Sequence, residues 1–452
     1  MTSTEIAHDL FQDQEFLSLV KSAHDCLECG KCSGGCPMME LFPEYFNPHH
    51  LLDQLIMDPQ EALRSMDIWF CASCYRCNKH CPQGIELPEI FVKLRKKALE
   101  EDGSRNLFRA VEIMKERIPF HTSFFRVCFH PERIPLDDSL VNELLEDRHQ
   151  KIDRKVAQES GKRIAVVGSG PAGLYLAWLM RKRGHAVTIF ESEEKAGGML
   201  RKCIPEYRIP SADIDQDIQQ LKEMGIEIRT GTPIGKKTNI RNLKIRYDAI
   251  FLATGAHQIT RLNIPGEELK GVYGSLEFLE ELKQGGISAS AIKKAVVIGG
   301  GNTAMDVAST MKKTGVKEVA LLYRRSRKEM PADINEIAET EKDGVEIREL
   351  VSPLTFSGQD HLEAIECQKM ELGLPDLTGR SRPLPVKDSK FTIEVDLAVN
   401  AVGEKPTIDF LPELISINGD GTIATDPMTV SYTHLTLPTT LPRCRSRWSG
   451  GV

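Results

Sequence analysis

Eight of the twelve cysteines in this 452-residue chain fall in two short runs with the same spacing. The first run is CLECGKCSGGCP and the second is CASCYRCNKHCP, and both follow the pattern C-x2-C-x2-C-x3-C-P. The N-terminal stretch is acidic and polar, without the basic and apolar regions of a secretory signal. We therefore expect a cytoplasmic chain with reduced thiols, whose clustered cysteines serve metal or redox chemistry rather than disulfides.

The repeated cysteine run is typical of proteins that hold two 4Fe-4S clusters. In such proteins, three thiolates of one run and the last thiolate of the other run bind each cluster. The spacing predicts one cluster on Cys26, Cys29, Cys32 and Cys81, and a second on Cys71, Cys74, Cys77 and Cys36. Structural zinc is the alternative, although zinc sites pair two C-x2-C knuckles rather than repeat a four-cysteine run. The remaining cysteines form no C-x-x-C pair, so no dithiol exchange centre is predicted.

The segment between the two runs carries the period of a helix. Apolar residues recur at helical spacing over 51–56, just after Pro48, and a second helical stretch covers 87–99. This arrangement resembles the helical ferredoxin-like domain found in the C-type polypeptide of heterodisulfide reductases and in succinate dehydrogenase-type iron–sulfur proteins. The resemblance covers residues 20–100 and implies an N-terminal α-helical ferredoxin domain.

Residues 163–191 form the pattern of a strand, a glycine turn, a helix and a second strand. Gly168, Gly170 and Gly173 make a GxGxxG fingerprint, in which the glycines permit a tight turn, a close pyrophosphate and helix–strand packing. Glu191 ends the second strand, where a ribose hydroxyl needs an acceptor; a solvated strand-end acid is the alternative. The pattern predicts a dinucleotide site but does not distinguish FAD from NAD.

A second strand–turn–helix–strand pattern covers 293–331, with Gly299, Gly301 and Ala304 at the fingerprint positions. Its second strand ends in Arg324 and Arg325 rather than in an acid. Guanidinium groups bind a 2′-phosphate, which a carboxylate would repel. The pattern therefore predicts NADPH, against the alternative of a solvated basic loop.

The segments GSGPAGL, GGMLRKCIPEYRIP and YDAIFLATGAH resemble the FAD-binding segments of glutamate synthase small subunits and of the flavin half of dihydropyrimidine dehydrogenase. The resemblance continues through GGGNTAMD and YRRSRKEMPA, and it implies FAD at the first site and NADPH at the second. The implied FAD-binding residues are Gly168, Ser169, Gly170, Pro171, Ala172, Gly173, Glu191, Gly198, Leu200, Thr254 and Gly255. The predicted NADPH-binding residues are Gly299, Gly301, Asn302, Thr303, Asp306, Arg324 and Arg325, with Asn302 and Asp306 as packing and orienting residues. No catalytic side chain is predicted, because hydride transfer between nicotinamide and flavin needs no protein acid or base.

These patterns predict an α/β flavoprotein with two Rossmann-like dinucleotide-binding domains, the NADPH domain inserted in the FAD domain, behind the α-helical ferredoxin domain. The expected boundaries are 1–110 for the dicluster domain, 111–160 for a helical linker, 161–265 for the first part of the FAD domain, 266–400 for the NAD(P)H domain, 401–430 for an incomplete second part of the FAD domain and 431–452 for a non-native tail.

The C-terminal end is expected to be truncated. In the family that the chain resembles, the segment after NAVGEKP should run into a strand ending in a Gly-Asp pair and then a long helix. The last residues, SYTHLTLPTTLPRCRSRWSGGV, have neither strand alternation nor helical period, with a disordered natural tail as the alternative. On this hypothesis the chain binds FAD poorly.

The formal charge of −7 gives no basic field for nucleic acid, and no apolar run reaches transmembrane length, so no membrane insertion is expected. The predicted function is that of an FAD-dependent oxidoreductase, which passes electrons between NADPH and two 4Fe-4S clusters. Electrons would go on to a redox partner protein or ferredoxin, with the chain as a subunit of a larger redox complex. Two alternatives stay open: a non-catalytic iron–sulfur relay subunit with an empty flavin site, and the small subunit of a glutamate synthase-like complex.

Overall fold

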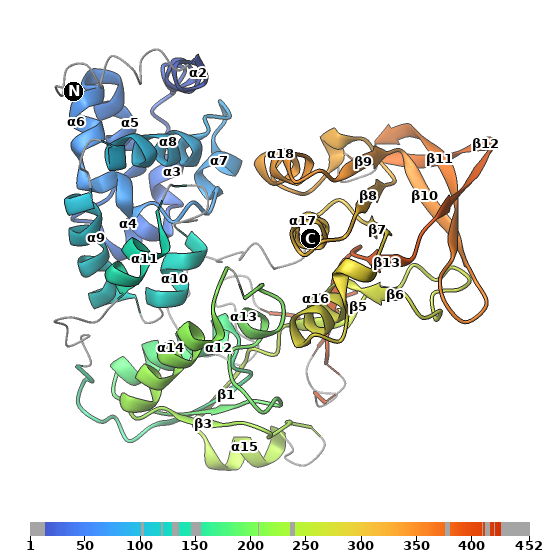
Figure 1. The fold of residues 1–452 in the computed structure, drawn as a ribbon. Coiled ribbons are helices and arrows are strands. Elements are labelled where there is room, and N and C mark those ends of the chain that lie inside the picture. Colours follow the sequence, from blue (N-terminus) through green and yellow to red (C-terminus); the bar gives the residue numbers. More distant parts are fainter. Residues whose placement is uncertain are drawn as a thin grey trace.

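The computed structural model describes residues 14–100, 104–118, 121–128, 134, 136–145, 155–206, 208–235, 240–375, 380–408, 410–411, 416–419 and 421–425. The predicted tail, 431–452, lies outside the described residues. Figure 1 shows three parts: a helical domain (14–145), a first α/β domain (163–252) and a second α/β domain (272–400). Within the described ranges, no helix combines the length and the apolar character that crossing a bilayer requires.

The helical domain holds both cysteine runs (blue to cyan in Figure 1). Its elements are α2 (Gln14–Ala23), α3 (Lys31–Gly34), α4 (Pro37–Leu41), α5 (Pro48–Met57), α6 (Pro59–Arg64), η1 (Met66–Phe70), α7 (Arg76–His80), α8 (Leu87–Glu100), α9 (Ser104–Arg117), α10 (His121–Cys128) and α11 (Asp138–Leu145). The insert between the runs is helical, as predicted. Asn47 caps α5 by accepting hydrogen bonds from the first backbone N–H groups after Pro48, and Leu51, Leu52 and Leu55 are buried.

One hydrophobic core joins the helices of this domain. Trp69, Phe42 and Phe91 are fully buried in it, and Cys71 belongs to the same core. Val111 and Leu144 belong to the same core, although the sequence analysis assigned 111–160 to a linker. The helices over 104–145 therefore pack as part of the helical domain, and they hold the cysteine-bearing loops against a rigid support.

The first α/β domain is built on a parallel sheet in the order β3-β2-β1-β4. The strands are β1 (Arg163–Val167), β2 (Ala186–Phe190), β3 (Glu227–Arg229) and β4 (Ala249–Leu252). The helices are α12 (Pro171–Lys182), α13 (Met199–Lys202), α14 (Ser211–Glu223) and α15 (Ile240–Arg246). The turn from β1 to α12 lies at the carboxyl end of the sheet, where nucleotides bind in folds of this kind.

The second α/β domain has a parallel sheet in the order β6-β13-β7-β8-β9. Its strands are β6 (Val272–Gly274), β7 (Lys294–Ile298), β8 (Glu318–Tyr323), β9 (Glu346–Glu349) and β13 (Leu397–Asn400). Its helices are α16 (Ser275–Gln284), η2 (Ala289–Ala291), α17 (Asn302–Lys313), η3 (Arg327–Glu329) and α18 (Ile334–Lys342). An antiparallel sheet that the sequence analysis did not predict, β10 (Val351–Ser357), β11 (Ala364–Pro375) and β12 (Ser381–Glu394), projects at the outer side of this domain (Figure 1).

The chain leaves and re-enters the first α/β domain through one pair of strands. β5 (Ala256–Ile259) leads out of it and β14 (Glu404–Pro406) follows the last strand of the second domain; the two pair antiparallel. Beyond β14, Phe410 lies against Gly235 of the first domain. This topology is the predicted insertion of one dinucleotide-binding domain into the other.

The helical domain forms hydrogen bonds and an ion pair with the α/β domains at two places. On α10, Ser123 donates from its backbone N–H and its hydroxyl to Asp217 of α14, at 3.0 and 2.6 Å, and Arg126 pairs with Asp213. Asn335 of α18 donates to Glu89 of α8 at 3.1 Å. The helical domain is therefore bonded to both dinucleotide-binding domains, one through α10 and the other through α8.

Candidate cofactor sites

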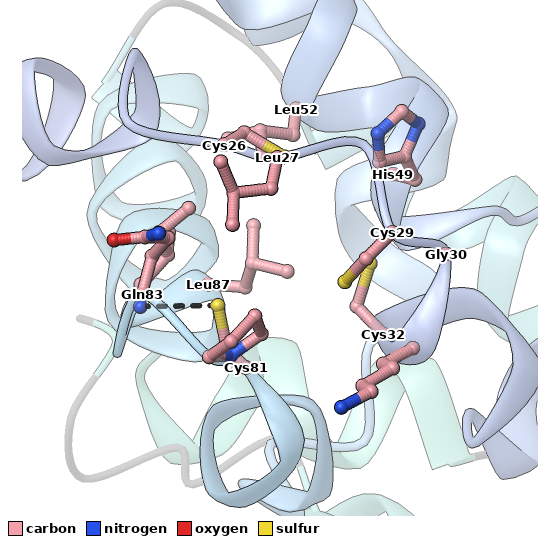
Figure 2. A pocket seen from close by; sticks show the side chains of 13 residues that line it. Cys26, Leu27, Cys29, Gly30, Cys32, His49, Leu52, Cys81, Gln83 and Leu87 are labelled. Carbon is pink, nitrogen blue, oxygen red and sulfur yellow. Dashed lines mark hydrogen bonds between the residues drawn. The ribbon is translucent and has the colours of Figure 1, made fainter.

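The first hollow in the helical domain is lined by Cys26, Cys29, Cys32 and Cys81. Figure 2 shows Cys29 and Cys32 together on one side of this hollow and Cys81 on another. The backbone N–H of Ile85 donates to Cys81 Sγ at 3.4 Å. This set is the one that the crossed pattern predicts, with three cysteines from one run and the last cysteine of the other.

The second hollow is lined by Cys36, Cys71, Cys74 and Cys77, which is the complementary crossed set. The backbone N–H of Ser73 donates to Cys71 Sγ at 3.4 Å. The folded chain thus brings together all eight predicted cysteines in two groups of four.

Burial raises the pKa of four of these thiols, those of Cys32, Cys36, Cys71 and Cys77. It raises the pKa of Cys36 to about 12, and the nearby Cys71 and Cys74 raise it further. Burial also raises the pKa of Cys71 to about 11, against the opposing effect of the Arg95 guanidinium. Among the described residues, no group of three or more His, Cys, Asp or Glu side chains is arranged to hold a single metal ion, whereas a 4Fe-4S cluster takes one thiolate on each of its four irons. Four cysteine thiols around each hollow are the donor set that binds a 4Fe-4S cluster, so the residues fit that group, whose iron would offset the cost of the thiolate charges.

The two cysteine loops repeat one backbone conformation. Between the first two cysteines of each run, Glu28 and Ser73 have φ of 50° and 48°. After the second cysteine, Gly30 and Tyr75 have φ of 69° and 55°. Left-handed backbone suits glycine but is unfavourable for an aromatic residue. The second loop thus carries a strained residue where the first loop has a glycine.

The first glycine turn has the geometry of the fingerprint. Gly168 has φ of 103°, and a Cβ there would lie 2.2 Å from the carbonyl oxygen of Ala253. A Cβ on Gly173 would lie 2.1 Å from the carbonyl oxygen of Gly168, so helix and turn pack closely. Gly170, which caps α12 ahead of Pro171, faces open space. A pyrophosphate can therefore approach the helix N-terminus at Gly170, between Ser169 and Ala172.

Glu191 is buried beside this turn rather than solvated. It accepts from Ser169 N at 2.9 Å and from the Ser169 hydroxyl, and also from Ser192 Oγ at 3.1 Å and Glu193 N at 2.9 Å. Burial acts to raise the pKa of Glu191, but the hydrogen bonds from Glu193, Ser169 and Ser192 outweigh it and lower the pKa. The carboxylate is therefore charged and already has four donors.

The remaining predicted residues of the first site surround the same turn. Gly197 N donates to Ser169 Oγ at 3.0 Å, and a Cβ on Gly198 would lie 2.7 Å from Gly170 Cα. Thr254 and Gly255 follow β4, and the Thr254 nitrogen lies near Gly168. Leu200 packs against a small core under α13. Nearby Cys203 is a buried thiol whose pKa burial raises to about 12, in keeping with a packing role.

The second glycine turn follows β7. Gly299 has φ of 151°, and a Cβ there would lie 2.3 Å from the carbonyl oxygen of Ala401. Gly301 caps α17, and its nearest neighbour is Pro331, 3.9 Å from where a Cβ would be. Thr303 and Ala304 in the first turn of α17 are buried. The N-terminus of α17 is thus open to a pyrophosphate, as at the first site.

The three arginines after β8 differ in their contacts. Arg324 is exposed and forms no hydrogen bond or ion pair with the described residues. Arg325 donates from Nε to the carbonyl oxygen of Ser381 at 2.8 Å, and Arg327 pairs with Glu341 and lies 3.8 Å from Glu349. Of these three guanidinium groups, that of Arg324 is the one without a hydrogen-bonding or ionic partner among the described residues.

The packing and orienting roles of Asn302 and Asp306 stay a prediction; both side chains contact residues outside α17. Asn302 Oδ1 accepts from Asp333 N at 2.9 Å, and Asp306 lies 3.6 Å from Arg208 of the first domain. Sequence reasoning missed Arg380, which donates to the Tyr323 hydroxyl at 3.0 Å at the end of β8. Arg380 directly precedes β12 and is 57 positions from Tyr323, so no local signal could have identified this contact.

The fold and the sites match known families. The profile of the pyridine nucleotide-disulphide oxidoreductase family matches residues 162–434, and that of the 4Fe-4S dicluster domain matches residues 22–85. The chain belongs to the pyridine nucleotide-disulphide oxidoreductase family. These matches confirm the predicted class, an NAD(P)H-linked oxidoreductase with an N-terminal iron–sulfur domain.

Several curated proteins are similar to the chain. The NADP(+)-dependent formate dehydrogenase subunit beta of Moorella thermoacetica is 32% identical over 78% of this chain and 54% of its own length. The NADPH-Fe(3+) oxidoreductase subunit beta of Geobacter sulfurreducens is 34% identical over 76% and 52%. The glutamate synthase [NADPH] small chain of Azospirillum brasilense is 27% identical over 73% and 72%. The chain spans about half the length of the first two relatives.

Among solved structures, FprA from Mycobacterium tuberculosis aligns with a TM-score of 0.50 at 22% identity, over 59% of this chain and 77% of its own. This similarity supports the fold of the two α/β domains.

Proposed function

We propose that the chain transfers electrons between NADPH and two 4Fe-4S clusters through FAD, and onward to a partner protein. The observation that carries this proposal is the crossed grouping of eight cysteines in the helical domain, joined to two open glycine turns in the α/β domains. A nucleotide site alone would suit many dehydrogenases. The cysteine hollows add a path for single electrons, which a simple dehydrogenase lacks.

Each site has a defined task for the residues of this chain. The turn at Gly168 and Gly170 holds a pyrophosphate at the N-terminus of α12, and the segment at Gly198 covers it. Arg324 selects a nucleotide with a 2′-phosphate at the second site. When bound, FAD supplies the exchange between hydride transfer from a nicotinamide and single-electron transfer to iron–sulfur clusters.

The position of the hollows suggests the direction in which a partner lies. The second hollow adjoins the second α/β domain, because Tyr75, from the loop that lines it, shares Glu89 with Asn335. Each hollow has one exposed cysteine, Cys29 or Cys74, but the first hollow is the more open at the surface, because Leu27 is 62% exposed whereas Ala72 at the equivalent position of the second run is 9% exposed. We infer that the cluster of the first hollow exchanges electrons with the partner.

The partner is proposed to be another subunit. The two relatives from Moorella and Geobacter are named as beta subunits, and the Azospirillum relative is named as a small chain. Those names describe their own complexes, a formate dehydrogenase, an NADPH-Fe(3+) oxidoreductase and a glutamate synthase. An exposed cluster rim on this chain supports membership of a redox complex of the same general kind.

The test is anaerobic purification of the full chain, with analysis of iron, sulfide and flavin, followed by reduction with NADPH. The proposal predicts about eight iron and about eight sulfide per chain, and cluster signals by electron paramagnetic resonance after NADPH is added. Adding NADPH to flavin-free protein is the control and should leave the clusters oxidised. Zinc in place of iron, or clusters that NADPH does not reduce in flavin-loaded protein, would contradict the proposal.

A further inference from the structure

Tyr75 occupies a position that favours glycine. It follows Cys74 in the second run, has φ of 55° and is 4% exposed, whereas the equivalent position of the first run is Gly30. A bulky residue persists in the left-handed region only where its surroundings hold it there. The Tyr75 hydroxyl donates to Glu89 Oε1, and this bond holds the ring in place.

The same carboxylate oxygen connects the cysteine loop to the second α/β domain. Glu89 Oε1 also accepts from Asn335 Nδ2 at 3.1 Å. Asn335 lies in the first turn of α18, and its backbone N–H donates to the cap residue Asp333 at 3.1 Å. The two sites are therefore joined through one atom of Glu89.

The connection ends at the nucleotide turn. Asp333 N donates at 2.9 Å to Asn302 Oδ1, and Asn302 is the first residue of α17, next to Gly301. A chain of four hydrogen bonds thus connects Tyr75, in the loop between Cys74 and Cys77, to Asn302 at the helix end that receives the pyrophosphate. The chain passes through Glu89, Asn335 and Asp333.

We propose that Tyr75, Glu89 and Asn335 are positioning residues that couple the occupancy of the NADP(H) site to the redox state of the cluster in the second hollow; this inference rests on the proposed function. A pyrophosphate at α17 shifts the Asn302–Asp333 contact and, through α18 and Glu89, the strained loop that carries Cys74 and Cys77. A change in the loop changes the hydrogen bonds around the cluster sulfurs, which set its reduction potential.

Coupling of this kind is reciprocal. If NADP+ shifts the midpoint potential of the cluster, reduction of the cluster must change the affinity for NADP+ by the same free energy. We expect a factor of about five, at the lower end of typical coupling between sites. For a one-electron couple, a fivefold ratio corresponds to a shift of about 40 mV, at about 59 mV per tenfold.

The experiment uses the full chain, purified without oxygen. The Kd for NADP+ is measured by calorimetry on oxidised and dithionite-reduced protein, and the cluster midpoints are measured by paramagnetic resonance with and without NADP+. We expect a Kd ratio of about five and a matching shift in only one of the two clusters. Tyr75→Phe, which removes only the hydroxyl, and Asn335→Ala, which changes a residue of α18 outside the cysteine loops, should each reduce both effects to within error. Tyr45→Phe removes a hydroxyl from the same domain outside the network and should keep both effects.

Iron-loaded Tyr75→Phe and Asn335→Ala proteins that retain the full Kd ratio and midpoint shift would overturn the coupling. So would an unmodified protein that holds both clusters and binds NADP+ with equal Kd in both redox states. Absence of iron, or of NADP+ binding, in the unmodified protein would overturn the proposed function and this inference together, and is distinguishable from the first two results.

Discussion

Replacing Arg324 by alanine should remove much of the preference for NADPH over NADH. The side chain is exposed beside the end of β8 and forms no hydrogen bond or ion pair with the described residues, so it is available for a 2′-phosphate. A hydrogen bond to a charged group contributes about 1.5–3 kcal/mol. Because solvent screens an exposed charge, we expect the contact between Arg324 and the 2′-phosphate to contribute an amount at the lower end of this range, about 1.5 kcal/mol. This free energy corresponds to roughly a tenfold change in affinity.

The assay is the steady-state reduction of an artificial acceptor such as ferricyanide, with NADPH and NADH compared as donors. For Arg324→Ala, kcat/KM should fall roughly tenfold with NADPH and change little with NADH. Arg327→Ala is the matched control, because Glu341 and Glu349 already engage that guanidinium. An equal fall with both donors, or an equal effect of Arg327→Ala, would refute the assignment of the 2′-phosphate to Arg324.

Three further outcomes are expected. Gly170→Ala should keep the stability of the protein but lower its flavin content, because a Cβ there enters the open space at the helix end. Gly168→Ala should instead lower the free energy of unfolding by at least about 2 kcal/mol, because the added Cβ would clash with the Ala253 carbonyl oxygen and the backbone at this position is left-handed. A larger loss of thermal stability in Gly170→Ala than in Gly168→Ala, with normal flavin content in Gly170→Ala, would contradict both expectations. Burial raises the pKa of Asp217 from 3.8 to about 6, so the folded state binds the proton more tightly and stability falls as pH rises from about 4 to 6. Asp217→Asn should remove this decline and stabilise the chain at pH 7 by up to about 3 kcal/mol. The measurement is the free energy of denaturant unfolding between about pH 4 and 7. The role of Asp217 would be contradicted if this free energy depended on pH equally in the variant and in the unmodified protein.

Local patterns in the sequence predicted much of the fold, because their physical causes are local. The cap at Asn47 and the buried face of α5 follow from residues within one or two turns. The glycine turns could be predicted because the GxGxxG motif marks positions where a Cβ would clash with the backbone, as at Gly168 and Gly173. The crossed grouping of cysteines could also be predicted, since the spacing of each run limits how its thiols converge.

Features that depend on distant pairing could not be predicted. The sheet of β10, β11 and β12 has long, partly exposed strands whose alternation carries no motif. Asn335 and Glu89 are 246 positions apart, and the sequence around neither residue predicts their hydrogen bond. The sequence placed Glu191 beside the first turn but could not indicate that Ser169, Ser192 and Glu193 already occupy its carboxylate.

The central claim is crossed ligation of two clusters, and the iron content of two double variants tests it most directly. Cys32 and Cys81 line the same hollow, whereas Cys32 and Cys36 belong to the same run but line different hollows. The account predicts that Cys32→Ser with Cys81→Ser loses one cluster and keeps about four iron per chain, while Cys32→Ser with Cys36→Ser loses both. The opposite result, with about four iron retained only in the Cys32→Ser and Cys36→Ser protein, would contradict crossed ligation.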